Sequence, residues 1–405
     1  MDARTSAAIA SDDRLARRNA LVLAAAQALA GGNNAVVLAT GAIVGAMLAP
    51  DKSLATLPVS AYVLGVWFGA LPFGWLARRL GRRTAFQIGT GCGVLTGLVC
   101  FWAVLQGSFL LFNAGTFLSG LYAAAHLGYR FAAADTASEA FRSRAISWVL
   151  TGGIVSAVLG PQVVIFTKDL WPPYLFAATY LAQAALALVS AFVLMLVDIP
   201  VPPRHAPEGA GRTLGEIARQ PRFIVAVACG VASYAMMNLV MTSAPLAMVQ
   251  CDHSISEATL GLQWHVLGMF VPSFVTGSLI ARYGVDRVVA AGLGLLAISA
   301  MIGIAGTTLW HFWIALVLLG VGWNFGFIGA TTMVTECHRP NERNRVQSFN
   351  DFLVFGAVAI SSFSSGTLLH HFGWNAVNEV VFPVVLSAGA LLAWAALRRR
   401  ASQAV

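Results

Sequence analysis

Long apolar runs, each about the length needed to cross a bilayer, recur along almost the whole chain of 405 residues. A helix needs ~20 apolar residues to cross a hydrocarbon core of ~30 Å, and backbone groups in lipid must be bonded within their own segment. The runs therefore predict twelve membrane-spanning helices. Their expected bounds are 20–49, 57–77, 85–105, 109–129, 145–167, 174–197, 223–249, 258–281, 288–309, 312–335, 346–369 and 380–397.

The balance of apolar and charged residues supports a membrane protein. Apolar residues make up 58% of the chain and charged residues 10%, against roughly 25% charged residues in an ordinary soluble domain. Such a chain has too little charge to cover a soluble surface, so its main solvent is lipid. The five cysteines are scattered without a CxxC pair, which indicates packing residues. We expect no metal site and no cofactor.

The distribution of basic residues predicts the orientation in the membrane. With the N-terminus in the cytoplasm, 22 of the 25 Lys and Arg residues fall inside, which is a strong positive-inside bias. The net charge of +8 is then explained by the anionic inner leaflet and not by nucleic acid. We expect a monomeric, multi-pass protein of a bacterial inner membrane with both termini in the cytoplasm.

A short basic turn occurs twice, once in each half of the chain. It occupies residues 74–83 and returns at residues 277–287, with the two copies offset by 203 positions. Each copy has two glycines seven positions apart, namely Gly74 and Gly81, then Gly277 and Gly284. A basic turn between two apolar runs is typical of a tight cytoplasmic hairpin.

A second repeated pattern follows the fourth and tenth runs. Asp135 precedes Arg142 by six intervening residues, and Glu336 precedes Arg343 in the same way, at an offset of 201. The repetition predicts two related six-helix halves. The expected parts are a tail at 1–19, a bundle at 20–197, a cytoplasmic linker at 198–220, a second bundle at 221–397 and a tail at 398–405.

With these features the chain resembles the transporters of the major facilitator superfamily over nearly its whole length. The resemblance implies an all-α fold of two pseudo-symmetric six-helix bundles that transports by alternating access. It also implies a cytoplasmic gate in which the turns meet the acid-x6-Arg elements. The residues of this gate are Gly74, Arg78, Arg79, Gly81, Arg82, Arg83, Asp135, Arg142, Gly277, Arg282, Gly284, Glu336 and Arg343.

The resemblance also implies specific contacts within this gate. In the first half, Arg79, Arg82 or Arg83 should meet Asp135 or Arg142. In the second half, Arg282 or Arg287 should meet Glu336 or Arg343.

One position departs from the family pattern. The family turn usually has an aspartate where this chain has Arg78, and the second copy has Ala281 there. The usual aspartate faces the start of span eleven, where exposed N–H groups carry partial positive charge and would repel an arginine. We therefore expect a swapped ion pair in which Arg78 bonds Asp351 or Glu342.

Polar side chains inside the spans predict a solute site near the membrane midplane. Amides both donate and accept hydrogen bonds, and indoles stack on flat rings. The candidate substrate-binding residues are Gln27, Asn33, Asn34, Asn238, Gln263, Trp264, Trp323 and Asn324. The alternative is that these amides join helices to one another, as polar residues commonly do in membranes. The glycines beside Asn33 fit close helix packing equally well.

Few ionisable groups lie within the spans, and these are the candidates for proton coupling. They are His265, Asp351, His126 and Arg130. Histidine titrates near neutral pH, and burial raises the pKa of a carboxyl group. The alternatives are packing histidines, an Arg130 that reaches back to the cytoplasmic face, and an Asp351 that serves the gate.

These features together favour a secondary active transporter of a small, neutral or aromatic solute. Motifs for ATP hydrolysis and for common hydrolases are absent from the sequence, so we do not expect an enzyme. One alternative is an antiporter that exports drugs or metabolites, suggested by Gly160-Pro161 in the fifth span. The other is a receptor on the same fold that binds solute without moving it.

Overall fold

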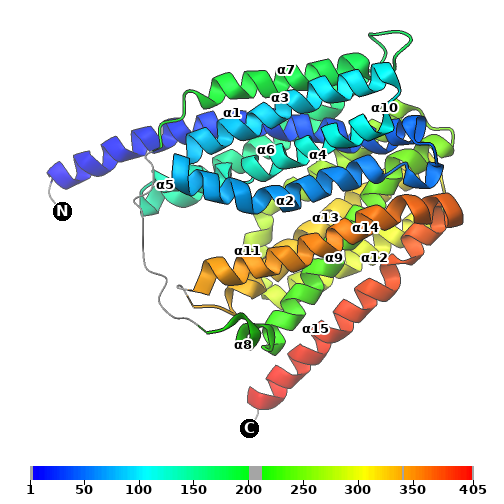
Figure 1. The fold of residues 1–405 in the computed structure, drawn as a ribbon. Coiled ribbons are helices and arrows are strands. Elements are labelled where there is room, and N and C mark those ends of the chain that lie inside the picture. Colours follow the sequence, from blue (N-terminus) through cyan, green and yellow to red (C-terminus); the bar gives the residue numbers. More distant parts are fainter. Residues whose placement is uncertain (1–2, 200–211, 340–341, 404–405) are drawn as a thin grey trace. The chain divides into compact units, whose positions relative to one another are not determined.

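The computed structural model describes residues 3–199, 212–339 and 342–403, and every regular element in these residues is a helix (Figure 1). The elements are α1 (Ala3–Leu48), η1 (Lys52–Leu54), α2 (Leu57–Leu80), α3 (Arg82–Gln106), α4 (Phe109–His126), α5 (Tyr129–Asp135), α6 (Glu139–Thr167), α7 (Ala177–Leu194), α8 (Leu214–Ala218), α9 (Pro221–Gln250), α10 (Ile255–Phe270), α11 (Ser273–Tyr283), α12 (Val285–Ala305), α13 (Leu309–Thr335), α14 (Arg343–Glu379) and α15 (Val381–Gln403).

The helices form two compact units. The first unit comprises Met1–Pro50 and Leu57–Arg204, and the second comprises Asp51–Thr56 and His205–Val405. In the first unit α1 packs on α6 and α7, α2 packs on α4, and α3 packs on α4 and α7. In the second unit α9 packs on α13 and α14, while α12 and α10 both pack on α13.

The described helices have the lengths that a membrane requires. Nine stretches are long and apolar enough to cross a bilayer, and the pair α10 and α11, bent by 40°, forms a tenth. One of the nine, Arg345–Arg399, contains both α14 and α15. The 18-residue α4 stands apart because Asn113 and His126 lower its apolar character. When α14 and α15 are taken separately and α4 is added, the twelve predicted spans are present.

Two spans are interrupted where the sequence predicted continuous helices. The fourth span was expected to run to Tyr129, but α4 ends at His126 and α5 begins after a break. Arg130 therefore lies in α5, outside the fourth span, and its side chain is exposed. The eighth span breaks at Pro272, which has no N–H to donate to the preceding turn.

The described part of the linker contains a short helix that the sequence analysis missed. Thr213 and Glu216 form a capping box at the start of α8, in which each side chain accepts a hydrogen bond from the other's backbone N–H. The pattern Thr-x-x-Glu is a recognised sign of a helix start. The sequence therefore held a usable signal for α8. Residues 200–211 of the linker lie outside the described part of the chain.

Small residues allow α1 and α6 to approach closely. A Cβ added at Gly160 would lie 2.6 Å from the carbonyl oxygen of Gly32, and one added at Gly31 would lie 2.5 Å from Oγ of Ser156. These distances are too short for any side chain to fit without movement. The glycines beside Asn33 are therefore close-packing contacts, and Gly160 serves the same contact from α6.

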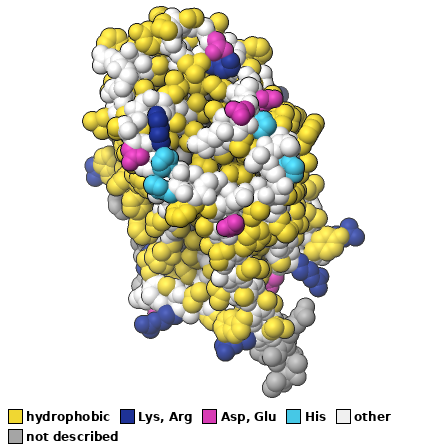
Figure 2. Space-filling view, turned by 90° about the vertical axis from the view of Figure 1, so that its right-hand side faces the viewer, with side chains coloured by type: hydrophobic (Ala, Val, Ile, Leu, Met, Phe, Trp, Pro, Cys, Tyr) yellow, Lys and Arg dark blue, Asp and Glu magenta, His cyan; other side chains and the backbone are white. Residues whose placement is uncertain are grey.

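Large apolar side chains cover much of the surface. Leu110, Leu71 and Phe166 are 82%, 77% and 72% exposed, respectively. Hydrophobic side chains make up most of the visible surface in Figure 2, where charged side chains are few. Apolar exposure on this scale is far beyond that of soluble monomers and fits a surface that faces lipid.

Candidate transport site and charge clusters

In the first unit, Asn33 is joined to another helix by a reciprocal pair of amide contacts. Its Nδ2 donates to the backbone oxygen of Gln183 at 2.9 Å, and Nε2 of Gln183 donates to Oδ1 of Asn33 at 3.1 Å. Both side chains are fully buried. The pair links α1 to α7 and gives both amide nitrogens a hydrogen-bond partner inside the membrane. In this structure Asn33 is thus directed at a neighbouring helix and has no exposed surface for a solute.

Asn34 and His126, which were predicted for different roles, lie against each other. Nδ2 of Asn34 lies 2.5 Å from Nε2 of His126, and Oδ1 of Asn34 accepts from Ser119 at 3.5 Å. Because the amide nitrogen can only donate, Nε2 of His126 accepts and the ring proton lies on Nδ1. Nδ1 has no hydrogen-bond partner among the described residues. Gln27, two turns earlier on α1, is half-buried beside Gly152 of α6.

The second unit contains a group of aromatic rings drawn from three helices. Trp323 and Phe327 of α13 stack with centroids 5.3 Å apart and planes inclined by 19°. Tyr234 of α9 meets both rings edge-on, at 5.4 Å and 4.9 Å, and lies 5.5 Å from Phe355 of α14. We call these four residues the aromatic cluster. Of these four residues only Trp323 was expected from the sequence, although the spacing of Trp323 and Phe327 places both on one helix face.

Trp323 has an unused hydrogen-bond donor. The side chain is 9% exposed, and its Nε1 has no partner among the described residues. A buried N–H without an acceptor is unfavourable by ~1–3 kcal/mol. A solute with a carbonyl or a ring nitrogen would satisfy this donor while its flat face stacks on the cluster.

Asn324, next in the chain, points to a different neighbour. Its Nδ2 donates to the backbone oxygen of Met269 and to Oγ of Ser273, both at 2.6 Å, and its Oδ1 accepts from Thr276 at 2.5 Å. These partners surround the break between α10 and α11 that Pro272 creates. The amide replaces hydrogen bonds that the broken helix cannot make. Asn324 therefore stabilises the break in this structure.

The other candidates in the second unit are spread over several contacts. Asn238 donates to the backbone oxygen of Val358 and to Ser361 at 3.4 Å, which ties α9 to α14. Gln263 is buried. Trp264 is 42% exposed and lines a separate apolar cavity of about 320 Å³ with Trp310 of α13. The structure therefore does not bring Trp264 and Trp323 together.

The coupling candidates occupy unlike surroundings. His265 is fully buried with Nδ1 at 2.8 Å from the backbone oxygen of Leu316, so it is held against α13. Asp351 is exposed near the start of α14 and accepts from Asn350 at 3.2 Å. Arg130 lies over the ring of Phe131 at 4.8 Å. A role for any of these groups in coupling stays a prediction.

In the first unit the expected gate contact is present. Nε of Arg82 donates to Oδ2 of Asp135 at 2.8 Å, which links the start of α3 to the end of α5. Arg79 lies over the ring of Trp75 at 4.7 Å, and Arg83 is exposed. The side chains of Arg78 and Arg142 lie outside the described residues.

In the second unit the expected contact of Glu336 with Arg282 or Arg287 is wrong. Arg222, at the start of α9, donates to Glu336 at 2.7 Å and to Asp286 at 2.6 Å, and Arg399 also contacts Asp286 at 2.6 Å. The second turn carries an acid at position 286, so Arg222 binds two acids, Asp286 and Glu336.

Among the described side chains of the second gate copy, Arg282 adds no ion pair to Glu336 or Asp286. Arg282 lies over its neighbour Tyr283 at 5.2 Å. The side chain of Arg343 is outside the described residues.

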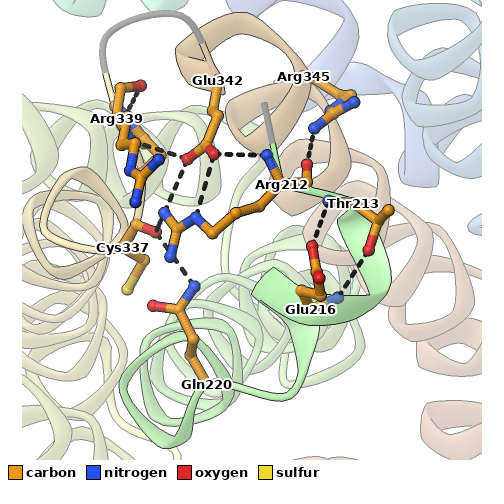
Figure 3. Close-up of polar contacts among 9 residues, drawn as sticks. Arg212, Thr213, Glu216, Gln220, Cys337, Arg339, Glu342 and Arg345 are labelled. Carbon is orange, nitrogen blue, oxygen red and sulfur yellow. Dashed lines mark hydrogen bonds and ion pairs between the residues drawn. The ribbon is translucent and has the colours of Figure 1, made fainter. Parts of the chain in front are cut away.

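Glu342 is enclosed by donors from Arg212 of the linker and from Arg339 in the connection between α13 and α14 (Figure 3). It accepts from Nη2, Nε and the backbone N–H of Arg212 at 2.7, 3.1 and 2.8 Å, and from the N–H of Arg339 at 2.9 Å. The side chain is 1% exposed. The Arg212 guanidinium and then the Arg339 N–H hold the pKa of Glu342 well below its usual range. Glu342 is thus bound by Arg212, and Asp351 remains the predicted partner of Arg78.

The two compact units and their membrane-length helices define a multi-pass helical membrane protein. The family model of the Major Facilitator Superfamily matches residues 22–262 and 226–405. The chain belongs to this superfamily, and it is a transporter and not an enzyme.

Known relatives and solved structures agree with this family. The chain is 48% identical to the riboflavin transporter RfnT of Brucella anthropi over 377 residues, which cover 93% of this chain and 95% of that protein. It is 28% identical to the MFS-type transporter YddS of Bacillus subtilis, over 84% of this chain and 83% of that one.

Among solved structures, the fold is similar to that of the xylose transporter XylE from E. coli. The TM-score is 0.71 at 13% identity, with 94% of this chain and 97% of that chain covered. The nucleoside transporter NupG is similar with a TM-score of 0.67 at 14% identity, covering 92% and 98% of the two chains.

Proposed function

We propose that this protein carries riboflavin across a bacterial inner membrane. The observation that carries the proposal is 48% identity to a riboflavin transporter over 93% of the chain. The matched region covers 93% of the chain and therefore includes residues of both units. The proposal refines the sequence-based expectation of a neutral or aromatic solute.

The chemistry of riboflavin matches the unused groups of the second unit. Its isoalloxazine ring is flat, broad and neutral, and it carries carbonyl oxygens and ring nitrogens. Trp323 and Phe327 offer stacked faces, and Nε1 of Trp323 offers a donor without a partner among the described residues. The ribityl chain carries hydroxyl groups, which pair with amides and hydroxyls that both donate and accept.

The proposed mechanism is alternating access by a monomer. The two six-helix units rock about a site near the midplane, so that the solute meets one side of the membrane at a time. The basic turns and both termini lie in the cytoplasm by the positive-inside rule. The ion pair of Arg82 with Asp135 joins the start of α3 to the end of α5 in the first unit. The ion pair of Arg222 with Glu336 joins the start of α9 to the end of α13 in the second unit.

Binding is tested by fluorescence titration of purified protein with riboflavin. Stacking of a ring on an aromatic side chain is worth ~1–3 kcal/mol by alanine substitution. We therefore expect Trp323→Ala to weaken riboflavin binding by about 5- to 150-fold. The matched control is Trp310→Ala, which removes an indole that is 66% exposed and should leave the affinity unchanged.

Transport is tested with the same protein in sealed proteoliposomes. We expect riboflavin to accumulate or exchange in a saturable manner. The Trp323→Ala variant should need a correspondingly higher riboflavin concentration to reach half of its maximal flux. Binding without flux would favour the receptor alternative, and absence of saturable binding would overturn the riboflavin proposal. Repeating the flux measurement with and without a pH gradient, in both directions, separates uptake from export and tests proton coupling.

A further inference from the structure

A cleft of about 1030 Å³ opens in the second unit along α12 and α15. One end of the cleft is lined by charged residues, namely Arg222, Asp286, Arg287, Glu336 and Arg399. The rest is lined by aliphatic side chains and glycines of the two helices. A cleft that is charged at one end and apolar along the rest is complementary to an amphiphilic ligand. We propose that it binds an anionic phospholipid, with the phosphate at the charged end and an acyl chain along the helices.

The apolar part of the cleft is bordered by glycines. No neighbouring atom is close enough to these glycines to exclude a side chain. A Cβ added at Gly294 of α12 or at Gly389 of α15 would meet no atom within 4 Å. Gly292, two positions from Gly294, behaves differently, since its Cβ would be 2.8 Å from the backbone oxygen of Gly322. Gly292 therefore allows α12 to pack on α13, whereas Gly294 and Gly389 border open space. That space accommodates a flexible chain of methylene groups lying against Leu386, which is 67% exposed.

The charged end carries more positive than negative charge. Both of its acids are engaged, since Glu336 is bound by Arg222 and Asp286 is bound by Arg222 and Arg399. Arg287 is exposed and forms no ion pair within the described residues. Three arginines against two acids leave a net charge of +1 at the mouth of the cleft. A phosphate group would complement this charge and accept hydrogen bonds from Arg287.

The start of α12 adds donors at the same end. Gly284 precedes the helix without a side-chain cap, and both Gly284 and Val285 line the cleft. The first N–H groups of a helix carry partial positive charge and favour an anion. By the positive-inside rule this end faces the cytoplasm, where the leaflet is anionic and attracts basic residues near its surface. An anionic phospholipid of the inner leaflet fits all three features, namely the positive end of the cleft, its apolar part and its position at the cytoplasmic side.

The test is lipid retention by the full-length protein in detergent, measured by native mass spectrometry. Phosphatidylglycerol and phosphatidylcholine are supplied in equal amounts. We expect the wild-type protein to retain phosphatidylglycerol at least about 5-fold over phosphatidylcholine. Arg287→Ala should reduce this preference to about 2-fold or less. Gly389→Leu places a side chain in the cleft at a position where an added Cβ meets no atom within 4 Å, and it should reduce retention of both lipids.

The control is Gly91→Leu on the exposed face of α3 in the first unit, where a Cβ also meets nothing within 4 Å. This variant should retain both lipids as the wild type does. Equal losses in Gly91→Leu and Gly389→Leu would overturn the proposal, as would an unchanged preference in Arg287→Ala. Glycerol phosphate, which has the head group without chains, should not displace the lipid. Its displacement of phosphatidylglycerol would show a simple anion site and would also overturn the proposal.

Discussion

The two units place an acid at the same repeat position but neutralise it with arginines from different elements. Asp135 and Glu336 are 201 positions apart. Asp135 is bound by Arg82 from the adjacent turn, whereas Glu336 is bound by Arg222 from the start of α9. The comparison teaches that a repeat can fix where a charge must be balanced without fixing which element supplies the partner.

The turns themselves explain the exchange of partners. At the 203-residue offset of the turns, Arg82 and Arg83 correspond to Val285 and Asp286. The second turn thus offers an acid where the first offers a base, and it creates a second negative charge near Glu336. Arg222, with its side chain 17% exposed, contacts both acids. At the same offset the first unit has Asn19, which donates to the backbone oxygen of Asp198 at 2.7 Å and needs no acid.

The largest effect is expected from Arg222→Ala. This change leaves Glu336 without its cation and Asp286 with Arg399 alone. Hydrogen bonds to charged groups contribute ~1.5–3 kcal/mol, so we expect the free energy of unfolding in detergent to fall by about 2–3 kcal/mol. Denaturant titration followed by tryptophan fluorescence measures the change. Arg219→Ala, an exposed neighbour, serves as the control, and an equal effect of the two changes would contradict the comparison.

Moving the base back to the turn is expected to give the next largest effect. Adding Val285→Arg to Arg222→Ala places an arginine where the first unit has Arg82. If the arginine that binds Glu336 can come from the turn as well as from α9, Val285→Arg should restore about 1 kcal/mol of the lost stability. This value is the upper range for a partly exposed ion pair. Val285→Lys in the same background tests charge without the planar guanidinium and should restore less. No recovery in either double variant would mean that the backbone of the second turn cannot present the base.

A smaller effect is expected from Arg82→Ala in the first unit. Asp135 is 36% exposed and Arg82 is 23% exposed, and exposed pairs contribute only ~0.2–1 kcal/mol. A double-mutant cycle with Asp135→Ala isolates the pair from other effects of each change. The coupling should lie below that of Arg222 with Glu336 measured in the same way. Arg83→Ala, which removes an exposed charge from the same turn, should show no coupling to Asp135.

The sequence predicted the framework because the membrane imposes it. Span length follows from bilayer thickness, repeated offsets located Asp135 and Glu336, and the family resemblance implied the contact of Arg82 with Asp135. The sequence could not predict which way a side chain faces inside a span. A helix that is apolar on all sides has no polar stripe to set its rotation. The pairing of Asn33 with Gln183 and the membership of Tyr234 in the aromatic cluster depend on that rotation, and only the packed helices reveal them.

The breaks in the helices were equally hard to predict. Pro272 interrupts the eighth span, but prolines at 161 and 245 lie within continuous helices. At the break beside Pro272, Asn324 donates a hydrogen bond to the backbone oxygen of Met269. The break after His126 involves no proline at all. Such features depend on partners distant in sequence, which a local pattern does not contain.

The same offset of 201 gives one further contrast between the units. Phe141 is buried in the first unit, with Arg17 over its ring at 5.5 Å, where the second unit has Glu342 bound by Arg212. In each unit an arginine guanidinium contacts the side chain at this position. In the first unit that side chain is Phe141, which does not titrate, and in the second unit it is Glu342, which does. Because the pKa of Glu342 is lowered, this contact stabilises the folded protein above the unfolded pKa of ~4.3. Its contribution is lost as the pH falls below that value toward the folded pKa.

Of the four effects, the one predicted by this contrast is the only one with a defined pH dependence. Glu342→Gln should be less stable than the wild type at pH 7, and the difference in unfolding midpoint should shrink steadily as the pH is lowered from 5 toward 3. Arg212→Gln should show the same convergence, since it removes the partner that lowers the pKa of Glu342. Phe141→Leu should give a difference from the wild type that does not change over this range. If the Glu342→Gln difference were equally constant, the contact would stabilise the protein through packing alone, and the ionic distinction between the two units would fail.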